Sequence, residues 1–305
     1  MIETFTETLE HALDTGTPIV IDGGLGTALE SRGVDLGHEL WSADLLRDDP
    51  DTIAEVHATF IRAGARIVTT ASYQATPLGF TRAGIDAAAG RGLITRSVEV
   101  ARSAAGGEAL VAGSIGPYGA AIGDGSEYTG DYRLSEAEFA DFHRARIEAL
   151  AEAGVDLLAI ETQPRIDEIL VLGRLAAEYG LPAWLSVTLA ADGAHLPDGS
   201  ALADLAEAAS TSASIEAIGV NCVRPGLVTP ALRELGAHTD LPLIAYPNSG
   251  ERYDAEAMTW QDSNGAGAGS WPVDEWTETG ALFIGGCCRT TPDHIAALAS
   301  GIGRG

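Results

Sequence analysis

Three cysteines, Cys222, Cys287 and Cys288, are the residues whose type and number point most directly to chemistry. Zinc accepts thiolates in a tetrahedral site, and a catalytic zinc site characteristically has three protein ligands and one open position. Three cysteines could supply those ligands if the fold brought them together. The cysteine count alone leaves two alternatives open, namely inert buried thiols and a redox pair or disulfide, and no C-x-x-C motif decides between them.

Eight short apolar runs are the elements that would have to position these cysteines. Near-continuous apolar runs are expected of strands that are buried on both faces of a parallel sheet. Helical patterns lie between them, with apolar residues recurring on one face over 52–62 and 138–150, and Thr291-Pro292 predicts the start of a last helix. The eight predicted strands lie at residues 19–21, 67–68, 110–111, 157–160, 184–187, 218–220, 243–245 and 282–284.

Strands that alternate with helices predict an α/β protein with a single-domain (β/α)8 TIM barrel over residues 1–305. Such a barrel carries its catalytic groups at the C-terminal ends of its strands, where neighbouring strand ends converge around one mouth. Cysteines that are distant in the sequence can therefore meet there. Polar residues do follow the apolar runs directly: Asp22, Ser72, Ser114, Glu161, Thr188, Asn221-Cys222, Asn248 and Cys287-Cys288. Glycine-rich segments at 122–130 and 264–269 are expected to form long loops at this rim.

The formal net charge of −26 argues against nucleic acid or an anionic membrane as a partner, because phosphate binding needs clustered basic residues. All 18 basic residues are Arg, and they form no such cluster. The chain begins without the features of a signal peptide, and no apolar run approaches the roughly 20 residues that span a bilayer. We therefore expect a cytoplasmic protein whose thiols stay reduced.

The residues around the cysteines resemble the zinc motifs of the homocysteine S-methyltransferase family. The likeness is carried by Gly-Val-Asn-Cys at 219–222 and Gly-Gly-Cys-Cys-Arg-Thr-Thr-Pro at 285–292, and it extends through similar segments at 22–27, 70–76, 113–119, 161–162 and 246–251. It is strongest to the bacterial enzymes that use S-methylmethionine. Gln163 is a departure, since an aliphatic residue is more usual after the Glu-Thr pair, and it could alter the homocysteine pocket.

The resemblance implies a zinc-dependent enzyme with Cys222, Cys287 and Cys288 as the metal ligands. It would transfer a methyl group from a sulfonium donor, S-methylmethionine or S-adenosylmethionine, to the zinc-bound thiolate of L-homocysteine and form methionine. A free alkyl thiol has a pKa near 8.5, so coordination would be needed to make it a thiolate at neutral pH. A sulfonium has a neutral leaving group, so in-line attack would need no general acid.

The resemblance also implies that Asp22 and Glu161 receive the α-ammonium group of homocysteine, since carboxylates form charge-assisted hydrogen bonds to ammonium. As isolated residues, these acids would read as helix caps or solvated side chains. Backbone N–H groups around Gly23 to Thr27, with Gly23 and Gly24 first, could receive the substrate carboxylate, or the glycines could merely permit a tight turn. Ser114 is expected to complete this substrate-binding set.

Aromatic residues on the rim segments could stabilise the donor cation with their ring faces, and Tyr73 and Tyr118 are the predicted contacts. Tyr128 and Tyr132 lie on the same segments, and loop packing is the alternative for all four. Asn221 could occupy the open position of the zinc before substrate arrives, although a structural hydrogen bond is the favoured role.

Three rival functions remain open at this point. The fold and metal could serve betaine as the donor, or another thiol or a selenol as the acceptor. Alternatively, the chain could be a non-catalytic zinc-binding or redox-sensing protein. Donor preference, oligomeric state and the reason for the missing lysines do not follow from the sequence.

Overall fold

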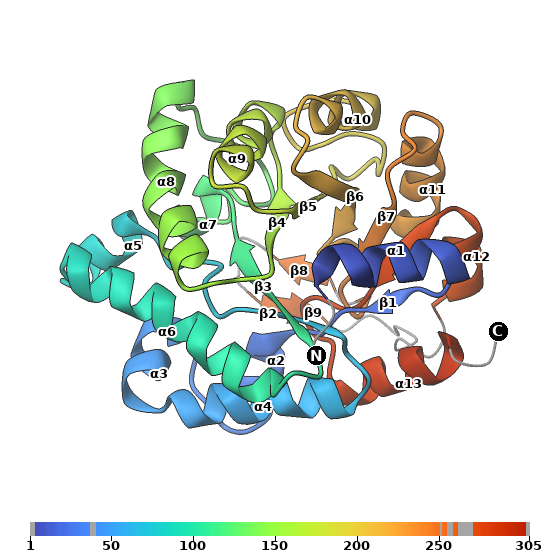
Figure 1. Ribbon diagram of the computed structural model, residues 1–305. Helices are drawn as coiled ribbons and strands as arrows, with labels where there is room; N and C mark the ends of the chain where they lie inside the picture. The colour runs from blue at the N-terminus through green and yellow to red at the C-terminus, as the bar shows by residue number, and fades with distance from the viewer. Residues whose placement is uncertain (1–3, 37–40, 251, 255–258, 262–270, 303–305) are drawn as a thin grey trace.

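The protein is a (β/α)8 barrel, as predicted (Figure 1). The computed structural model describes residues 4–36, 41–250, 252–254, 259–261 and 271–302. Eight parallel strands are hydrogen-bonded in the order β1-β10-β7-β6-β5-β4-β3-β2, and a parallel bridge between Ile21 and Ile67 brings the two outer strands together. The strands are β1 (Ile19–Val20), β2 (Ile67–Thr69), β3 (Leu110–Ile115), β4 (Leu157–Gln163), β5 (Ala183–Val187), β6 (Ile215–Asn221), β7 (Leu243–Tyr246) and β10 (Ala281–Ile284). All eight predicted strands are confirmed.

Helices surround the strands. They are α1 (Phe5–Thr15), α2 (Leu25–Glu30), α3 (Trp41–Asp48), α4 (Pro50–Arg62), α5 (Pro77–Arg82), α6 (Ala87–Ala105), α7 (Tyr118–Ile122), α8 (Glu136–Glu152), α9 (Ile166–Glu178), α10 (Leu202–Ser210), α11 (Pro225–Gly236), α12 (Val273–Glu278) and α13 (Pro292–Ile302). The helices predicted over 52–62 and 138–150, and the start at Pro292, correspond to α4, α8 and α13. A small antiparallel hairpin, β8 (Arg252–Asp254) and β9 (Thr259–Gln261), is added after β7.

Local capping explains where the helices begin. Asp49 caps α4 by accepting the N–H of Thr52, and Pro50 occupies the first helical position. At α8, Ser135 and Glu138 form a capping box in which each side chain accepts the other's backbone N–H. These caps set the direction in which each helix leaves its loop and returns along the barrel.

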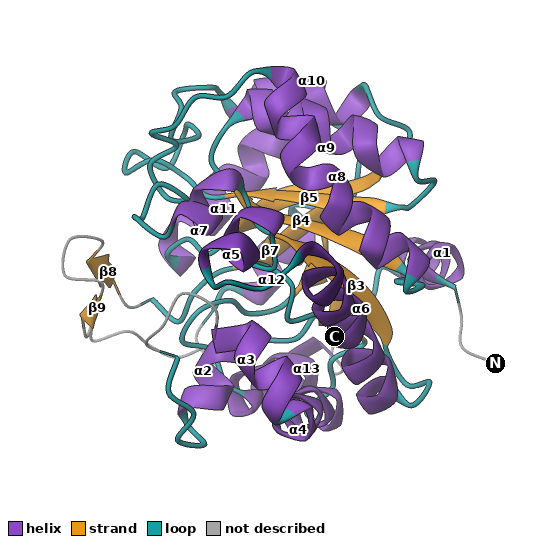
Figure 2. Cartoon of the chain, turned by 90° about the vertical axis from the view of Figure 1, so that its left-hand side faces the viewer, coloured by secondary structure: helices purple, strands orange, loops and turns teal. Residues whose placement is uncertain are grey.

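One end of the barrel is closed by α1. Phe5, Leu9 and Ala12 of this helix belong to a buried apolar cluster with inward-facing strand residues such as Trp184 and Phe283. The rings of Phe5 and Phe283 stack with centroids 6.0 Å apart. The hairpin β8–β9 lies at the opposite end of the barrel from α1 (Figure 2). The carboxyl ends of the strands lie at the other end of the barrel, which α1 does not cover.

In the described part of the chain, no helix is long and apolar enough to cross a membrane. The glycine-rich segment 264–269, predicted to be a rim loop, lies outside the described residues.

Candidate metal centre and substrate pocket

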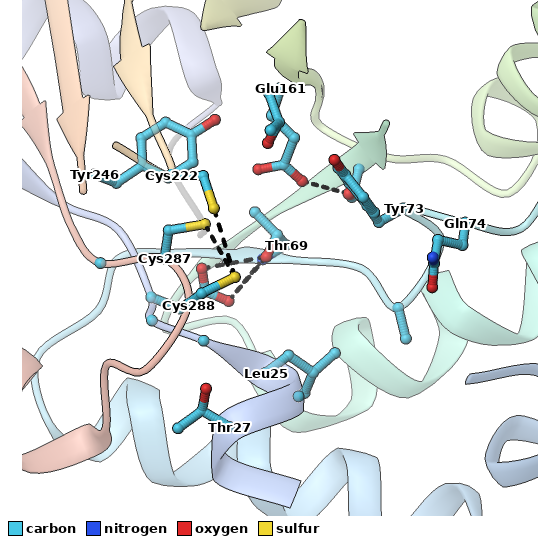
Figure 3. A pocket seen from close by; sticks show the side chains of 18 of the residues that line it. Leu25, Thr27, Thr69, Tyr73, Gln74, Glu161, Cys222, Tyr246, Cys287 and Cys288 are labelled. Atoms are coloured by element: carbon cyan, nitrogen blue, oxygen red, sulfur yellow. Dashed lines mark hydrogen bonds between the residues drawn. The ribbon is translucent and has the colours of Figure 1, made fainter. Parts of the chain in front are cut away.

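The three cysteines meet at the open end of the barrel. Cys222 directly follows β6, whereas Cys287 and Cys288 follow β10, and β7 lies between these two strands in the sheet. The Sγ atoms of Cys222 and Cys288 are 3.5 Å apart, those of Cys287 and Cys288 are 4.0 Å apart, and all three lie within 4.8 Å of one another. Figure 3 shows the sulfur atoms pointing toward one another. The cluster could therefore hold a metal ion through three sulfur ligands.

The backbone around the cysteines explains how they reach this position. Cys222 has a left-handed backbone with φ of 51°, which costs a non-glycine residue free energy and turns the chain sharply at the end of β6. Its N–H donates to the Tyr246 carbonyl at 3.2 Å, and the Cys287 N–H donates to the Pro247 carbonyl at 2.8 Å. Gly219 permits close strand packing here, because a Cβ at this position would lie 1.9 Å from the Ile244 carbonyl oxygen.

The thiols affect each other's ionisation. Hydrogen bonding with Cys287 and then Cys288 lowers the pKa of the Cys222 thiol, while the hydrogen bonds shared with Cys222 raise the pKa values of Cys287 and Cys288. One thiol of the three therefore ionises readily, and its negative charge disfavours ionisation of the others. A cation at the cluster would stabilise all three thiolates together.

The cysteines form one wall of a pocket at the carboxyl ends of the strands. Its lining also includes six of the predicted contact residues, Asp22, Gly23, Gly24, Tyr73, Ser114 and Glu161. Leu25, Gly26 and Thr27 of the backbone segment predicted to receive the substrate carboxylate line it too, as does the rim aromatic Tyr128. The lining residues not predicted from the sequence are Thr69, Thr70, Ala71, Gln74, Glu127, Thr162, Tyr246 and Gly286. The pocket thus joins three thiols to three carboxylates, Asp22, Glu161 and Glu127.

Asp22 and Glu161 are buried acids that face this pocket. The Asp22 carboxylate accepts the Thr69 N–H at 2.9 Å, and Glu161 accepts the Ser114 hydroxyl. Burial raises the pKa of Asp22 well above its usual range and that of Glu161 to about 7. Within the described residues, neither acid forms an ion pair with Arg or His. Neither charged form therefore has a direct ion-pair partner among the described residues, although the charge of Arg146 offsets part of the burial effect on the pKa of Glu161, and a cationic ligand would stabilise both.

Gly23 and Gly24 lead from β1 into α2. A Cβ at Gly23 would lie 2.8 Å from the Phe60 ring, so glycine is needed for close packing there. The Gly24 N–H already donates to the Thr290 hydroxyl at 3.0 Å. This bond connects the first strand end to the loop that carries Cys287 and Cys288.

Two predicted contacts, Asn221 and Tyr118, lie outside the pocket lining. Asn221 is fully buried, and its side chain bonds the Thr162 N–H and hydroxyl at 2.7 Å each, with the Cys287 sulfur 4.0 Å from its amide nitrogen. The Tyr118 ring packs against Tyr132 and Phe142 with centroids 5.4 and 4.9 Å away. Asn221 therefore stabilises the backbone at the end of β4, and Tyr118 packs against aromatic residues outside the pocket.

Gln163, the departure from the family pattern, is also outside the lining. Its amide nitrogen donates to the carbonyls of Ile115 at 3.2 Å and Glu161 at 3.1 Å. Gln163 therefore touches the backbone of a pocket residue without contributing its own side chain to the pocket.

A buried charged network behind the pocket was not recognised in the sequence. Arg146 of α8 is fully buried, and its guanidinium donates to the Tyr73 carbonyl and the Gly116 carbonyl at 2.7 Å each. It also contacts His143 Nδ1 at 2.9 Å, and His143 Nε2 lies 2.7 Å from Glu168. Burial lowers the pKa of Arg146 to about 10, so it stays charged at neutral pH.

Glu168 extends this network to the loop between α7 and α8. Its carboxylate accepts the Tyr118 N–H at 2.6 Å and the Tyr132 hydroxyl, so both ends of the segment 118–132 are held by one side chain. In the sequence of α8 only the spacing of the apolar residues was interpreted, although His143 and Arg146 lie between them. A basic residue inside an apolar helical face is the signal that could have identified this network.

Comparisons with known proteins agree with this geometry. A family model described as homocysteine S-methyltransferase matches residues 19–302. The homocysteine S-methyltransferase of Escherichia coli (strain K12) is 46% identical over 302 residues, covering 95% of this chain and 97% of the relative, and that of Bacillus subtilis (strain 168) is 42% identical, covering 96% of each.

A solved structure shares the fold as well. The metallated form of the Escherichia coli homocysteine methyltransferase MmuM superposes with a TM-score of 0.87 at 44% identity, covering 96% of this chain and 99% of that one. The family model and the relatives both span nearly the whole barrel, including the strand ends that carry the three cysteines. The chain belongs to the homocysteine S-methyltransferase family.

Proposed function

We propose that this protein is a zinc-dependent methyltransferase that transfers a methyl group from a sulfonium, with S-methylmethionine as the preferred donor, to the sulfur of L-homocysteine, giving methionine. The observation that carries the proposal is one pocket in which three clustered thiols face the buried acids Asp22 and Glu161. A thiol substrate with an α-ammonium group matches both features. The relatives named for homocysteine methylation support the same reaction.

The three sulfur atoms fit zinc. A Zn–S bond of about 2.3 Å in a tetrahedron implies sulfur separations of about 3.8 Å. The separations of 3.5 and 4.0 Å to Cys288 lie on either side of that value. Thiolates are soft ligands that favour zinc over calcium or magnesium. Zinc held by Cys222, Cys287 and Cys288 would lower the pKa of a substrate thiol so that it reacts as a thiolate.

The remaining residues bind and orient the substrate. Asp22 and Glu161 would take the α-ammonium group of homocysteine, which would form the direct ion pair that neither acid makes among the described residues. The strand ends that carry them are fixed by the barrel, so the substrate sulfur is held close to the cysteines. Orientation of two reactants can contribute roughly 7–11 kcal/mol, and attack on a sulfonium needs no proton transfer from the protein.

Methionine formation with different donors tests this proposal. The zinc-loaded protein is incubated with L-homocysteine and either S-methylmethionine, S-adenosylmethionine or betaine, and methionine is measured together with bound metal. We expect about one zinc per chain and the highest kcat/KM with S-methylmethionine. Product from betaine alone would overturn the sulfonium donor, and no methionine from any donor would overturn the reaction.

A further inference from the structure

Glu127 is a third acid of the pocket and was not predicted from the sequence. It lies on the loop between α7 and α8, which folds back tightly over α7. A Cβ at Gly119 would lie 2.5 Å from the Glu127 nitrogen, and the Gly130 N–H donates to the Ser126 carbonyl at 2.8 Å. Glu127 is therefore fixed by local packing and reaches the pocket from a loop, whereas Asp22 and Glu161 belong to strand ends.

The Glu127 carboxylate lacks a cationic partner in the described part of the chain. The Tyr73 hydroxyl donates a hydrogen bond to Glu127 Oε2 at 3.3 Å. Burial, and then the nearby Cys222 thiolate, raise the pKa of this carboxyl to about 7. A buried carboxylate is costly unless it is paired, so a ligand cation would stabilise its charged form.

The position of Glu127 beside the thiols indicates which ligand cation it meets. The next residue, Tyr128, has its hydroxyl 3.5 Å from the Cys222 sulfur, and both Glu127 and Tyr128 line the pocket. The substrate thiol must lie beside these cysteines, and the donor sulfur must lie one methyl group beyond it. The positive centre of the donor is thus brought to the part of the pocket that this loop covers.

We propose that the Glu127 carboxylate, held by the Tyr73 hydroxyl, is the counter-charge that recognises the positively charged sulfur of the methyl donor. This inference rests on the proposed function. In the reaction, the electron pair of the homocysteine thiolate forms the new S–CH3 bond, and the electrons of the broken bond stay on the donor sulfur, which becomes a neutral thioether. The charge that Glu127 pairs with therefore disappears when the methyl group leaves, and the spent donor is held less tightly.

The test is Glu127→Gln, which keeps the shape of the side chain and removes its charge. We expect KM for S-methylmethionine to rise about tenfold or more, corresponding to the loss of about 1.4 kcal/mol. KM for homocysteine and the zinc content should stay within about twofold of the wild type, since among the described residues the Glu127 carboxylate is hydrogen-bonded to Tyr73 and not to the cysteines, Asp22 or Glu161. Glu127→Asp, which keeps the carboxylate, should recover part of the donor affinity.

The matched control is Glu108→Gln, which makes the same charge change at an exposed residue before β3, at the other end of the barrel. An unchanged donor KM in Glu127→Gln, an equal rise in both KM values, or loss of zinc would each overturn this inference while leaving wild-type methionine formation intact. A wild-type protein that makes no methionine from any sulfonium would instead overturn the proposed function. The two failures are therefore distinguishable.

Discussion

The two ends of the barrel are made by the same eight strands but differ in what fills them. At the end covered by α1, Phe5, Trp184 and Phe283 pack in an apolar cluster whose members are at most 8% exposed. At the opposite end, thiols and carboxylates surround a pocket. Tyr246 belongs to both, because it is part of the apolar cluster and lines the pocket. Its hydroxyl accepts the Trp184 N–H at 3.0 Å and marks the boundary between them.

Backbone strain follows the same division. Among the described residues, the non-glycine residues with positive φ are Thr162, Cys222 and Arg289. Thr162 lies at the end of β4, Cys222 directly follows β6, and Arg289 follows Cys288 in the loop after β10, so all three are on the open side. Residues in this conformation cost of order 1–3 kcal/mol each. We infer that the closed end supplies stability and that the open end gives up stability to place reactive groups. Substitutions at the two ends should therefore separate activity from stability.

Cys222→Ala should produce the largest effect. Removing one of three thiolate ligands is expected to lower zinc content well below one per chain and to reduce methionine formation by at least about a thousandfold, since the thiol then keeps its ordinary pKa. Metal analysis and product assay on the same preparation measure both. A metal-free variant with full activity would rule out the zinc mechanism.

Phe283→Ala should show the opposite pattern. Its side chain is fully buried, and truncation of a buried Phe costs about 3–5 kcal/mol of unfolding free energy. Denaturant unfolding should record this loss while KM for homocysteine and the zinc stoichiometry of the folded protein stay unchanged. Leu13→Ala is the control, because Leu13 of α1 is 56% exposed and its loss should shift stability little. Equal effects of the two variants would contradict the assignment of stability to this end.

Glu161→Gln tests whether this acid at the open end of the barrel binds homocysteine, the methyl acceptor. A hydrogen bond to a charged group contributes roughly 1.5–3 kcal/mol, so we expect KM for homocysteine to rise about tenfold to a hundredfold. Steady-state kinetics at saturating donor measure this change. The proposed role is wrong if the variant alters only the donor KM.

The pH dependence of kcat/KM for homocysteine also tests the role of Glu161. Burial raises the Glu161 pKa from 4.5 to about 7, so this carboxyl is neutral below that pH and charged above it. Because the charged form receives the ammonium group, kcat/KM for homocysteine should fall as the pH falls through about 7. When kcat/KM is measured against pH at saturating donor, the Glu161→Gln variant should not show this fall near pH 7. A fall retained unchanged in the variant would assign it to another group.

Thr4→Ala should give the smallest effect and only at the closed end. Thr4 caps α1 by accepting the Glu7 N–H, and loss of such a cap costs about 1 kcal/mol. Thermal unfolding should shift down slightly without a change in either KM. A change in substrate affinity would show that α1 reaches beyond the apolar cluster.

Much of the open end was predictable because strand periodicity and the barrel rule act together. A polar residue follows each predicted strand, and the barrel rule brings these strand ends, with Cys222, Cys287 and Cys288, to one mouth. The substrate roles of Asp22 and Glu161 came from the family resemblance rather than from spacing. The structure adds that both are buried and that neither forms an ion pair with Arg or His among the described residues.

The missed residues share a physical reason. Glu127 is carried by a loop whose path depends on the packing of Gly119 and Ser126, and no periodicity reports such a path. Tyr118 was predicted to face the donor, but its ring packs against Tyr132 and against Phe142 of α8, outside the pocket lining. Arg146 was missed because the apolar residues of α8 already accounted for the packing of that helix.

Arg146 connects two loops at the open end of the barrel. One guanidinium holds the carbonyls of Tyr73 and Gly116, which belong to loops after two different strands. If either loop moved away, the buried guanidinium would lose a hydrogen-bond partner, and a hydrogen bond to a charged group contributes about 1.5–3 kcal/mol. The two loops therefore behave as a single rigid part, and a new substrate specificity would have to be built from side chains on that part rather than from a new path of either loop.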